Sequence, residues 1–125
     1  MSGYVIQKEP FVVPTTDGKL IEEFFGNASI SLGDYSIAHM VAPPGWSEPF
    51  QTPEFDEVTF IISGKKKFEI DHVEMIEEVV LGKNESICIK KGSKVRYSNP
   101  FDEAVEYMSF CIPAFTPERV NREES

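Results

Sequence analysis

The sequence contains no long apolar run and no leader-like beginning. No stretch approaches the roughly 18 uninterrupted apolar residues of a membrane-spanning helix. The first residues also lack the basic and apolar regions of a secretory signal peptide. We therefore expect a soluble, cytoplasmic protein that has no membrane partner.

Basic residues are also scarce. The chain has 12 lysines and arginines against 21 acidic residues, which gives a formal net charge of −9. Because contacts to a phosphate backbone require clustered Lys and Arg, this balance predicts that nucleic acid is not a partner. The one basic cluster, Lys65-Lys66-Lys67, leads into alternating Phe68 and Ile70. This pattern indicates a solvated hairpin or edge strand.

Cysteine and histidine are rare too, with two of each. Cys88 and Cys111 lie in apolar runs without the spacing of a metal site or a redox pair. They are expected to be reduced and buried. His72 lies in a turn, whereas His39 lies inside an apolar run.

Short β-type runs separated by Gly, Pro and Asx turns make up most of the chain. At least eight such runs follow one another at near-regular spacing, without a convincing long helix. This pattern predicts an all-β protein built as an antiparallel sandwich or small barrel. The length of 125 residues suits one domain over residues 1–125, with an N-terminal arm at about 1–14 and a C-terminal tail at about 114–125.

Three segments deserve a separate prediction. Leu20–Phe25 fits either a short helix or an irregular strand, and residues 29–32 fit a strand. In the run at residues 35–42, alternation places His39 on the same face as Ile37 and Val41. A histidine among apolar side chains is more often part of a core or pocket wall than a ligand or an acid/base group, so the first interpretation is favoured.

Two sets of residues show a recurrent spacing. Gly45, Glu57 and Gly64 form the first set, with Gln51 and Pro53 between them. Gly92 and Asn99 form the second, with Val95 between them. This spacing resembles the two motifs of the cupin family, whose histidine positions would correspond to Gln51, Pro53 and Val95. The resemblance implies a cupin-like antiparallel β-sandwich or jelly-roll barrel.

Two shorter segments resemble one group of small cupins. Phe55-Asp56-Glu57-Val58 and Pro113-Ala114-Phe115 are similar to segments of the cupins of ethanolamine utilisation. The chain is therefore expected to be a small single-domain cupin with degenerate metal-binding motifs, somewhat similar to that group.

The resemblance also bears on metals. Cupins hold a transition metal with three histidines and one glutamate, and here those positions carry Gln51, Pro53, Glu57 and Val95. Proline and valine offer no side-chain ligand, so we predict no metal and no cofactor. An unusual site in which His39 approaches Glu57 across the barrel stays open as an alternative.

A polar pocket is expected inside such a barrel. If Glu57 faces inward, alternation also turns Thr59 inward, and an inward Val95 implies an inward Tyr97. Glu57 and His39 are candidate catalytic bases, although Glu57 equally fits a structural role. Tyr107 fits the core as well as the pocket. The candidate ligand-binding residues are Gln51, Glu57, Tyr97, His39, Trp46 and Tyr107.

These expectations lead to a predicted function. The first hypothesis is a small-molecule-binding sensor or accessory protein that takes a small polar or carboxylated ligand. One alternative is a metal-independent isomerase, epimerase or lyase with Glu57 or His39 as the base. Another is an accessory or phosphotransfer role in a catabolic pathway resembling ethanolamine utilisation. The sequence does not decide whether the chain is an enzyme. The proline-bounded N-terminal arm predicts a homodimer.

Overall fold

Strands dominate the fold of residues 3–123, the part of the chain that the computed structural model describes. The elements, in chain order, are β1 (Phe11–Val12), β2 (Leu20–Phe25), α1 (Asn27–Ile30), β3 (Ser36–Ala42), β4 (Asp56–Ser63), β5 (Lys66–Asp71), β6 (Ile76–Leu81), β7 (Ser86–Ile89), β8 (Lys94–Ser98), β9 (Val105–Ile112) and α2 (Pro117–Val120). The prediction of an all-β fold is confirmed.

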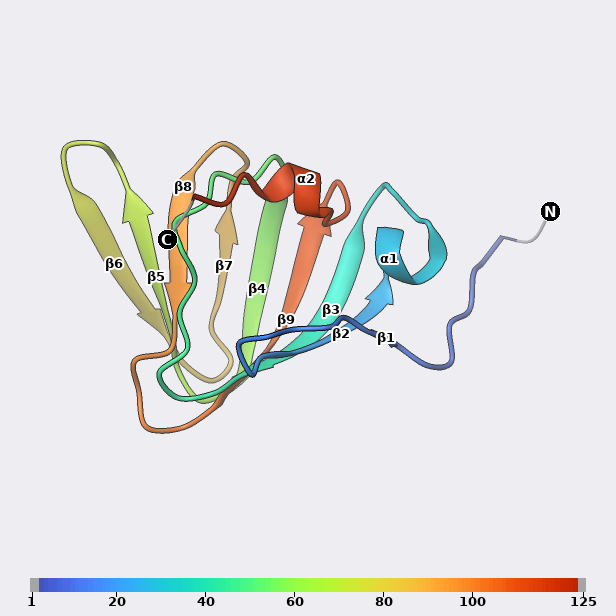
Figure 1. The fold of residues 1–125 in the computed structure, drawn as a ribbon, viewed down its shortest axis with the longest axis horizontal. Helices are drawn as coiled ribbons and strands as arrows, with labels where there is room; N and C mark the ends of the chain where they lie inside the picture. Colours follow the sequence, from blue (N-terminus) through green and yellow to red (C-terminus); the bar gives the residue numbers. More distant parts are fainter. Residues whose placement is uncertain (1–2, 124–125) are drawn as a thin grey trace.

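Two antiparallel sheets make up the architecture. Six strands form the larger sheet in the order β1-β2-β3-β9-β4-β7, and three form the smaller sheet in the order β6-β5-β8. The smaller sheet lies beside the larger one in the view of Figure 1. β7 is an edge strand of the larger sheet, and β8 is an edge strand of the smaller one. Every strand pair is antiparallel, as expected for a sandwich built from hairpins and longer crossovers.

Strict alternation of buried and exposed residues shows which face of each strand turns inward. In β4 the inward residues are Glu57, Thr59 and Ile61, which confirms the expectation that they share a face. In β8 they are Val95 and Tyr97. Successive side chains of a strand point to opposite faces. The inward faces of β4 and β8 therefore bury polar and apolar side chains next to one another.

One local prediction needs correction, and the structure decides another that was left open. Residues 29–32 are not a strand, because Asn27–Ile30 forms one helical turn that ends at Ser31 in a left-handed conformation. Leu20–Phe25 is a strand with a bulge between Glu23 and Phe25, where its register against β3 shifts. The bulge explains the ambiguous pattern, because an extra residue interrupts period-two alternation.

The hydrophobic core fills one end of the space between the sheets. Its largest fully buried side chains include Tyr107, Phe68 and Ile61, and Trp46 packs against the same cluster. A smaller cluster joins Phe55 to the C-terminal segment. None of the helices within residues 3–123 is long and apolar enough to cross a membrane.

Candidate functional site

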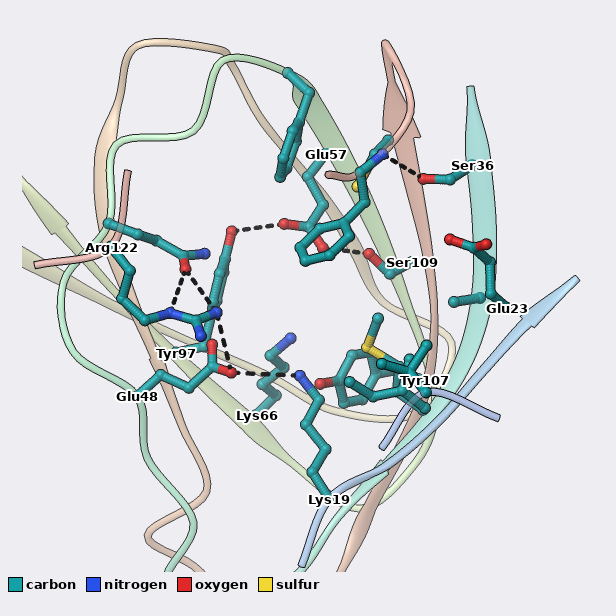
Figure 2. Close-up of a pocket in the computed structure, with 18 residues that line it drawn as sticks. Lys19, Glu23, Ser36, Glu48, Glu57, Lys66, Tyr97, Tyr107, Ser109 and Arg122 are labelled. Carbon is teal, nitrogen blue, oxygen red and sulfur yellow. Dashed lines mark hydrogen bonds and ion pairs between the residues drawn. The ribbon is translucent and has the colours of Figure 1, made fainter. Parts of the chain in front are cut away.

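A cavity of about 100 Å³ lies between the two sheets, beyond the hydrophobic core. Figure 2 shows its lining side chains converging from both sheets and from the loops that join them. The residues are Val13, Lys19, Ile21, Glu23, Ser36, Ala38, Met40, Glu48, Gln51, Phe55, Glu57, Lys66, Tyr97, Tyr107, Ser109, Cys111, Phe115 and Arg122. Most of them are buried, so the cavity reaches deep into the fold.

Glu57 lies on one wall of this cavity and is held by two hydroxyl groups. The Tyr97 hydroxyl donates to its Oε1 over 2.9 Å, and the Ser109 hydroxyl donates to its Oε2. Burial, reinforced by the negative charge of Glu57, raises the pKa of Tyr97 well above its usual value. Burial and the same carboxylate also raise the pKa of Cys111. The phenol and the thiol therefore stay protonated near neutral pH.

Lys66 provides a buried ammonium group at the centre of the site. The residue is 1% exposed, and its Nζ lies 3.7 Å from the centroid of the Tyr107 ring and 4.4 Å from that of Tyr97. Within residues 3–123, no carboxylate lies within ion-pair distance of this nitrogen. Aromatic faces attract a cation but do not neutralise it. Lys66 is thus a buried cation without an anionic partner.

Lys19 brings a second ammonium group to the cavity. Its backbone is fixed by a turn in which Thr15 Oγ1 donates to the Lys19 carbonyl over 2.6 Å and the Lys19 amide donates to Asp17 Oδ1 over 3.1 Å. The Lys19 Nζ lies 4.6 Å above the Trp46 ring and 3.8 Å from Glu48 Oε2. Lys19 therefore has an anionic partner, unlike Lys66.

The two ammonium groups differ in their proton affinity. Burial lowers the pKa of Lys66, and the nearby positive charge of Lys19 lowers it further, so that the opposing effects of Tyr107 and Glu57 do not restore its usual value. Burial would also lower the pKa of Lys19, but Tyr107 and Glu48 outweigh it and raise that pKa. The buried Tyr107 hydroxyl makes no hydrogen bond of good geometry to any described residue, although it is close enough to both lysines to oppose the lowering of their pKa values by burial.

The loop before β4 and the C-terminal segment form the mouth of the cavity. The Gln51 amide donates to the Val95 carbonyl and the Val95 amide to the Gln51 carbonyl, both over 2.9 Å, which fastens the loop to β8. Arg122 donates from Nε and Nη2 to Gln51 Oε1 over 3.4 Å, and its Nη2 lies 3.6 Å from Glu48 Oε2. Arg122 is exposed, so a third cation lies where the cavity opens to solvent.

The structure brings four of the predicted site residues to this cavity and leaves two outside it. Gln51, Glu57, Tyr97 and Tyr107 line the cavity. Trp46 does not line it, because its ring packs in the core behind Lys19 while its Nε1 donates to Asp17 Oδ2 over 2.8 Å.

His39 lies on the opposite face of β3. Ser36, Ala38 and Met40 are the β3 residues that line the cavity, so the alternate residues point outward. His39 Nδ1 lies 2.9 Å from Glu22 Oε1, and its Nε2 lies 2.6 Å from Glu106 Oε2. His39 therefore cannot meet Glu57 in the cavity. Across residues 3–123, no group of three or more His, Cys, Asp and Glu side chains is placed to hold a metal ion.

Sequence reasoning missed three cations of the site. Residues 65–67 were predicted to form a solvated hairpin or edge strand, but Lys66 and Lys67 begin β5, the central strand of the smaller sheet. Alternation from Phe68 turns Lys66 inward, a signal that the sequence does contain. No pattern in the sequence singles out Lys19 or Arg122. Both depend on contacts between distant segments, which local pattern does not report.

Comparison with known proteins gives one curated relative and many similar structures. No family model matches the chain. The relative, named Endoribonuclease YbeY from Myxococcus xanthus (strain DK1622), is 42% identical over 118 residues, which cover 90% of this chain. They cover 37% of the relative, so the chain spans little more than a third of that protein.

Solved structures show the fold. Oxalate decarboxylase from Bacillus subtilis matches 95% of this chain and 33% of its own with a TM-score of 0.75 at 12% identity. The EutQ protein of Clostridium difficile matches 85% of this chain and 73% of its own with a TM-score of 0.62 at 20% identity. The predicted cupin-like antiparallel β-sandwich is therefore confirmed. At these identities the likeness extends to the fold alone.

The curated relative corrects the family and function expected from the sequence. It carries the name of a different family, so the assignment to small cupins similar to those of ethanolamine utilisation is wrong. Its name also points to RNA cleavage, which contradicts the predicted small-molecule sensor and the two alternatives, a metal-independent isomerase or lyase and a phosphotransfer accessory. The volume of the cavity agrees with the correction of the small-molecule function. Pockets for drug-sized ligands usually have volumes of about 300 to 1,000 Å³, and the volume of this cavity is smaller.

The same relative corrects the predictions of a small-molecule partner and of no nucleic-acid partner, whereas the homodimer stays a prediction. That exclusion rested on a net charge of −9. Net charge sums over the whole surface, whereas a local site needs only a few cations. Lys19, Lys66 and Arg122 come together in one cavity despite the acidic total.

Proposed function

We propose that this chain takes part in RNA processing, as a cupin-like RNA-binding partner or part of an endoribonuclease. One observation carries the proposal: 42% identity over 118 residues to a protein named as an endoribonuclease. The matched region covers 37% of that relative, so the proposal assigns RNA binding to this chain and leaves strand cleavage to the remainder of such a protein.

The cavity between the sheets is the RNA-binding site in this proposal. It combines three cations with two phenols, a set that suits a phosphate group. Glu57 acts as a structural anchor, because each of its oxygens already accepts a hydrogen bond, from Tyr97 or from Ser109. In this proposal the carboxylate orients the Tyr97 ring and balances part of the lysine charge.

The acidic surface limits how RNA approaches. A strand can enter at Arg122 but is repelled elsewhere by the excess of carboxylates. Few phosphates are neutralised at such a local site. We also propose a cytoplasmic location, which agrees with the two free thiols Cys88 and Cys111 and with access to cellular RNA.

Fluorescence anisotropy with a labelled single-stranded RNA tests the proposal. Wild-type chain is expected to bind with a salt dependence of slope about −2, since about 0.7 counterions per neutralised phosphate are released from single strands and the site offers three cations. Arg122→Gln is expected to weaken binding several-fold. Lys83→Gln is the matched control, because Lys83 lies in an exposed turn beside a separate groove.

The outcomes separate clearly. Binding that Arg122→Gln weakens and Lys83→Gln preserves supports the proposal. Absence of RNA binding at 50 mM salt would overturn it. A parallel gel assay with the same RNA measures cleavage. Cleavage by the isolated chain would contradict the proposal that this chain only binds RNA and that another part of such a protein cleaves it.

A further inference from the structure

Lys66 carries a charge that no ion pair within the described part of the chain neutralises. Lysine is almost never fully buried unless it is paired, because removal of an ammonium group from water costs several kcal/mol. Lys66 is 1% exposed, and only aromatic rings, those of Tyr107, Tyr97 and Phe68, face its Nζ closely. An anion placed beside this nitrogen would provide the missing partner.

A second unpartnered group points into the same cavity. The Tyr107 hydroxyl is fully buried and makes no hydrogen bond to any described residue. A buried hydroxyl without a partner costs about 1 to 3 kcal/mol. Lys19 Nζ lies 5.7 Å from the Tyr107 ring centroid, and Figure 2 shows both ammonium groups on the side of the cavity where the Tyr107 hydroxyl lies. Three hydrogen-bond donors therefore line the same part of the cavity.

The size of the cavity restricts what that anion can be. Its volume of about 100 Å³ is well below the roughly 300 to 1,000 Å³ of the pockets that hold drug-sized ligands. A phosphate group fits this space, whereas a nucleoside does not. An internal phosphodiester carries a nucleoside on both sides, so only a phosphate at the end of a strand can enter the cavity.

The mouth offers the next contacts that such a strand needs. Phe115 is exposed there, and its ring centroid lies 6.0 Å from that of Phe55. An exposed aromatic ring can stack on a base. Arg122 lies at the same opening, where its guanidinium contacts Gln51 Oε1 at 3.4 Å and Glu48 Oε2 at 3.6 Å. The mouth thus provides one stacking surface and one cation outside a buried phosphate-sized space.

We propose that the cavity seats the terminal phosphate of an RNA strand, with Lys66, Lys19 and the Tyr107 hydroxyl as its donors and Phe115 and Arg122 contacting the adjoining nucleotide. This inference rests on the proposed function and deepens it, because it names the substrate class as phosphate-ended RNA. Such strands are the products of phosphodiester cleavage, so an endonuclease reaction supplies them.

The test compares one short RNA sequence in three forms: with a 5′-phosphate, with a 3′-phosphate, and with hydroxyls at both ends. Titration calorimetry measures the dissociation constant of each. A terminal phosphate at one of the ends is expected to tighten binding at least about tenfold, the factor that corresponds to one hydrogen bond to a charged group. The 5′ and 3′ forms distinguish which end is seated.

Lys66→Met and Tyr107→Phe are expected to abolish this preference, and both keep the apolar volume of the site. Lys67→Met is the matched control, because Lys67 points outward on the same strand and pairs with Glu78 at 3.3 Å. Thermal unfolding of each variant confirms that it folds. Tyr107→Phe provides the decisive variant if Lys66→Met does not fold.

Other outcomes overturn the inference. Equal affinity for all three RNA forms would leave the proposed function standing and remove the terminal-phosphate site. A preference that persists in both Lys66→Met and Tyr107→Phe would place the phosphate elsewhere. Free inorganic phosphate that competes at the same concentration as the RNA would show that the strand contributes nothing. Failure of every RNA to bind would overturn the proposed function itself.

Discussion

The Nζ of Lys66 lies 3.7 Å from the centroid of the Tyr107 ring. The two residues start from different sheets: Lys66 is the first residue of β5, and Tyr107 is in the middle of β9. Their contact spans the space between the sheets, and the cation–π attraction offsets part of the cost of burying the ammonium group. The part of the desolvation free energy that this attraction does not offset makes Lys66 the least stabilised charge of the cavity.

Replacement of Lys66 by Met should therefore stabilise the protein at pH 7, by about 1 kcal/mol, since an apolar side chain of similar length removes a buried unpaired charge. The effect should shrink at alkaline pH. Because the pKa of Lys66 is lower in the folded state than in the unfolded state, the wild type gains stability as pH rises through the folded pKa toward 10.5. Urea unfolding of both proteins at pH 7 and pH 10 measures the difference.

Lys67→Met serves as the comparison for this experiment. Lys67 is only partly buried and pairs with Glu78, so its replacement should change the free energy of unfolding by less than about 1 kcal/mol at either pH. A Lys66→Met protein that is less stable than wild type at pH 7 would contradict the unpaired state of Lys66.

Glu57→Gln should destabilise the protein by about 1 to 3 kcal/mol. The carboxylate accepts hydrogen bonds from Tyr97 and Ser109, and an amide retains only one oxygen for two buried donors. Thermal unfolding measures the loss. Glu74→Gln, in an exposed turn, is expected to leave the stability unchanged. A fully stable Glu57→Gln protein would contradict the anchoring role and return Glu57 to the candidate catalytic groups.

His39 should make the stability depend on pH near neutrality. Burial tends to lower its pKa, but hydrogen bonds to Glu106 and Glu22 outweigh burial and raise it above 6.5. The resulting stabilisation is fully present below pH 6.5 and is lost as pH rises through the folded pKa. His39→Gln should remove this dependence, which thermal unfolding between pH 5.5 and 8.5 would measure.

His72→Gln is the control for that series. His72 also faces a carboxylate, Glu77 at 2.9 Å, but both side chains are about half exposed. Solvent weakens such a pair, so the pH profile of this variant should match that of the wild type. A His39→Gln protein with the wild-type profile would show that the two glutamates do not hold the protonated ring.

Asn99→Ala should destabilise the fold by about 2 to 4 kcal/mol. Its buried Nδ2 donates to the carbonyls of Ala42, Pro43 and Glu103, and its Oδ1 accepts from the Phe101 amide over 3.1 Å. Asn99→Asp preserves the acceptor but removes the donors, so it should lose nearly as much. Chemical denaturation of both variants tests this, and wild-type stability of Asn99→Asp would contradict the importance of the three donated bonds.

Much of the fold follows from the sequence alone. Alternation predicted the inward face of β4, with Glu57 beside Thr59, and the inward pairing of Val95 with Tyr97. Thr116 and Pro117 begin α2 in the positions that a helix start favours, and the Thr116 side chain accepts from the Arg119 amide. These features are local, because period-two exposure and helix capping depend on neighbouring residues.

Other features depended on contacts that the sequence does not report. The pattern of β3 puts His39 with Ile37 and Val41 but does not say which face is inside, and the face of Ala38 and Met40 is the one that meets the cavity. Residues 29–32 read as a strand, yet a single helical turn forms there. In both cases packing against other segments decided between local alternatives of similar energy.

The sequence by itself determined the strands, their turns and the residues that share a face, because these follow from side-chain alternation and backbone preference. Only the tertiary structure decided that Lys19, Lys66 and Arg122 converge. They come from three distant segments: the pairing of β5 with β8 places Lys66, and a bridge between Gln51 and Arg122 places the C-terminal segment. A net charge of −9 conceals such a site, since electrostatic recognition depends on where charges lie and not on their sum.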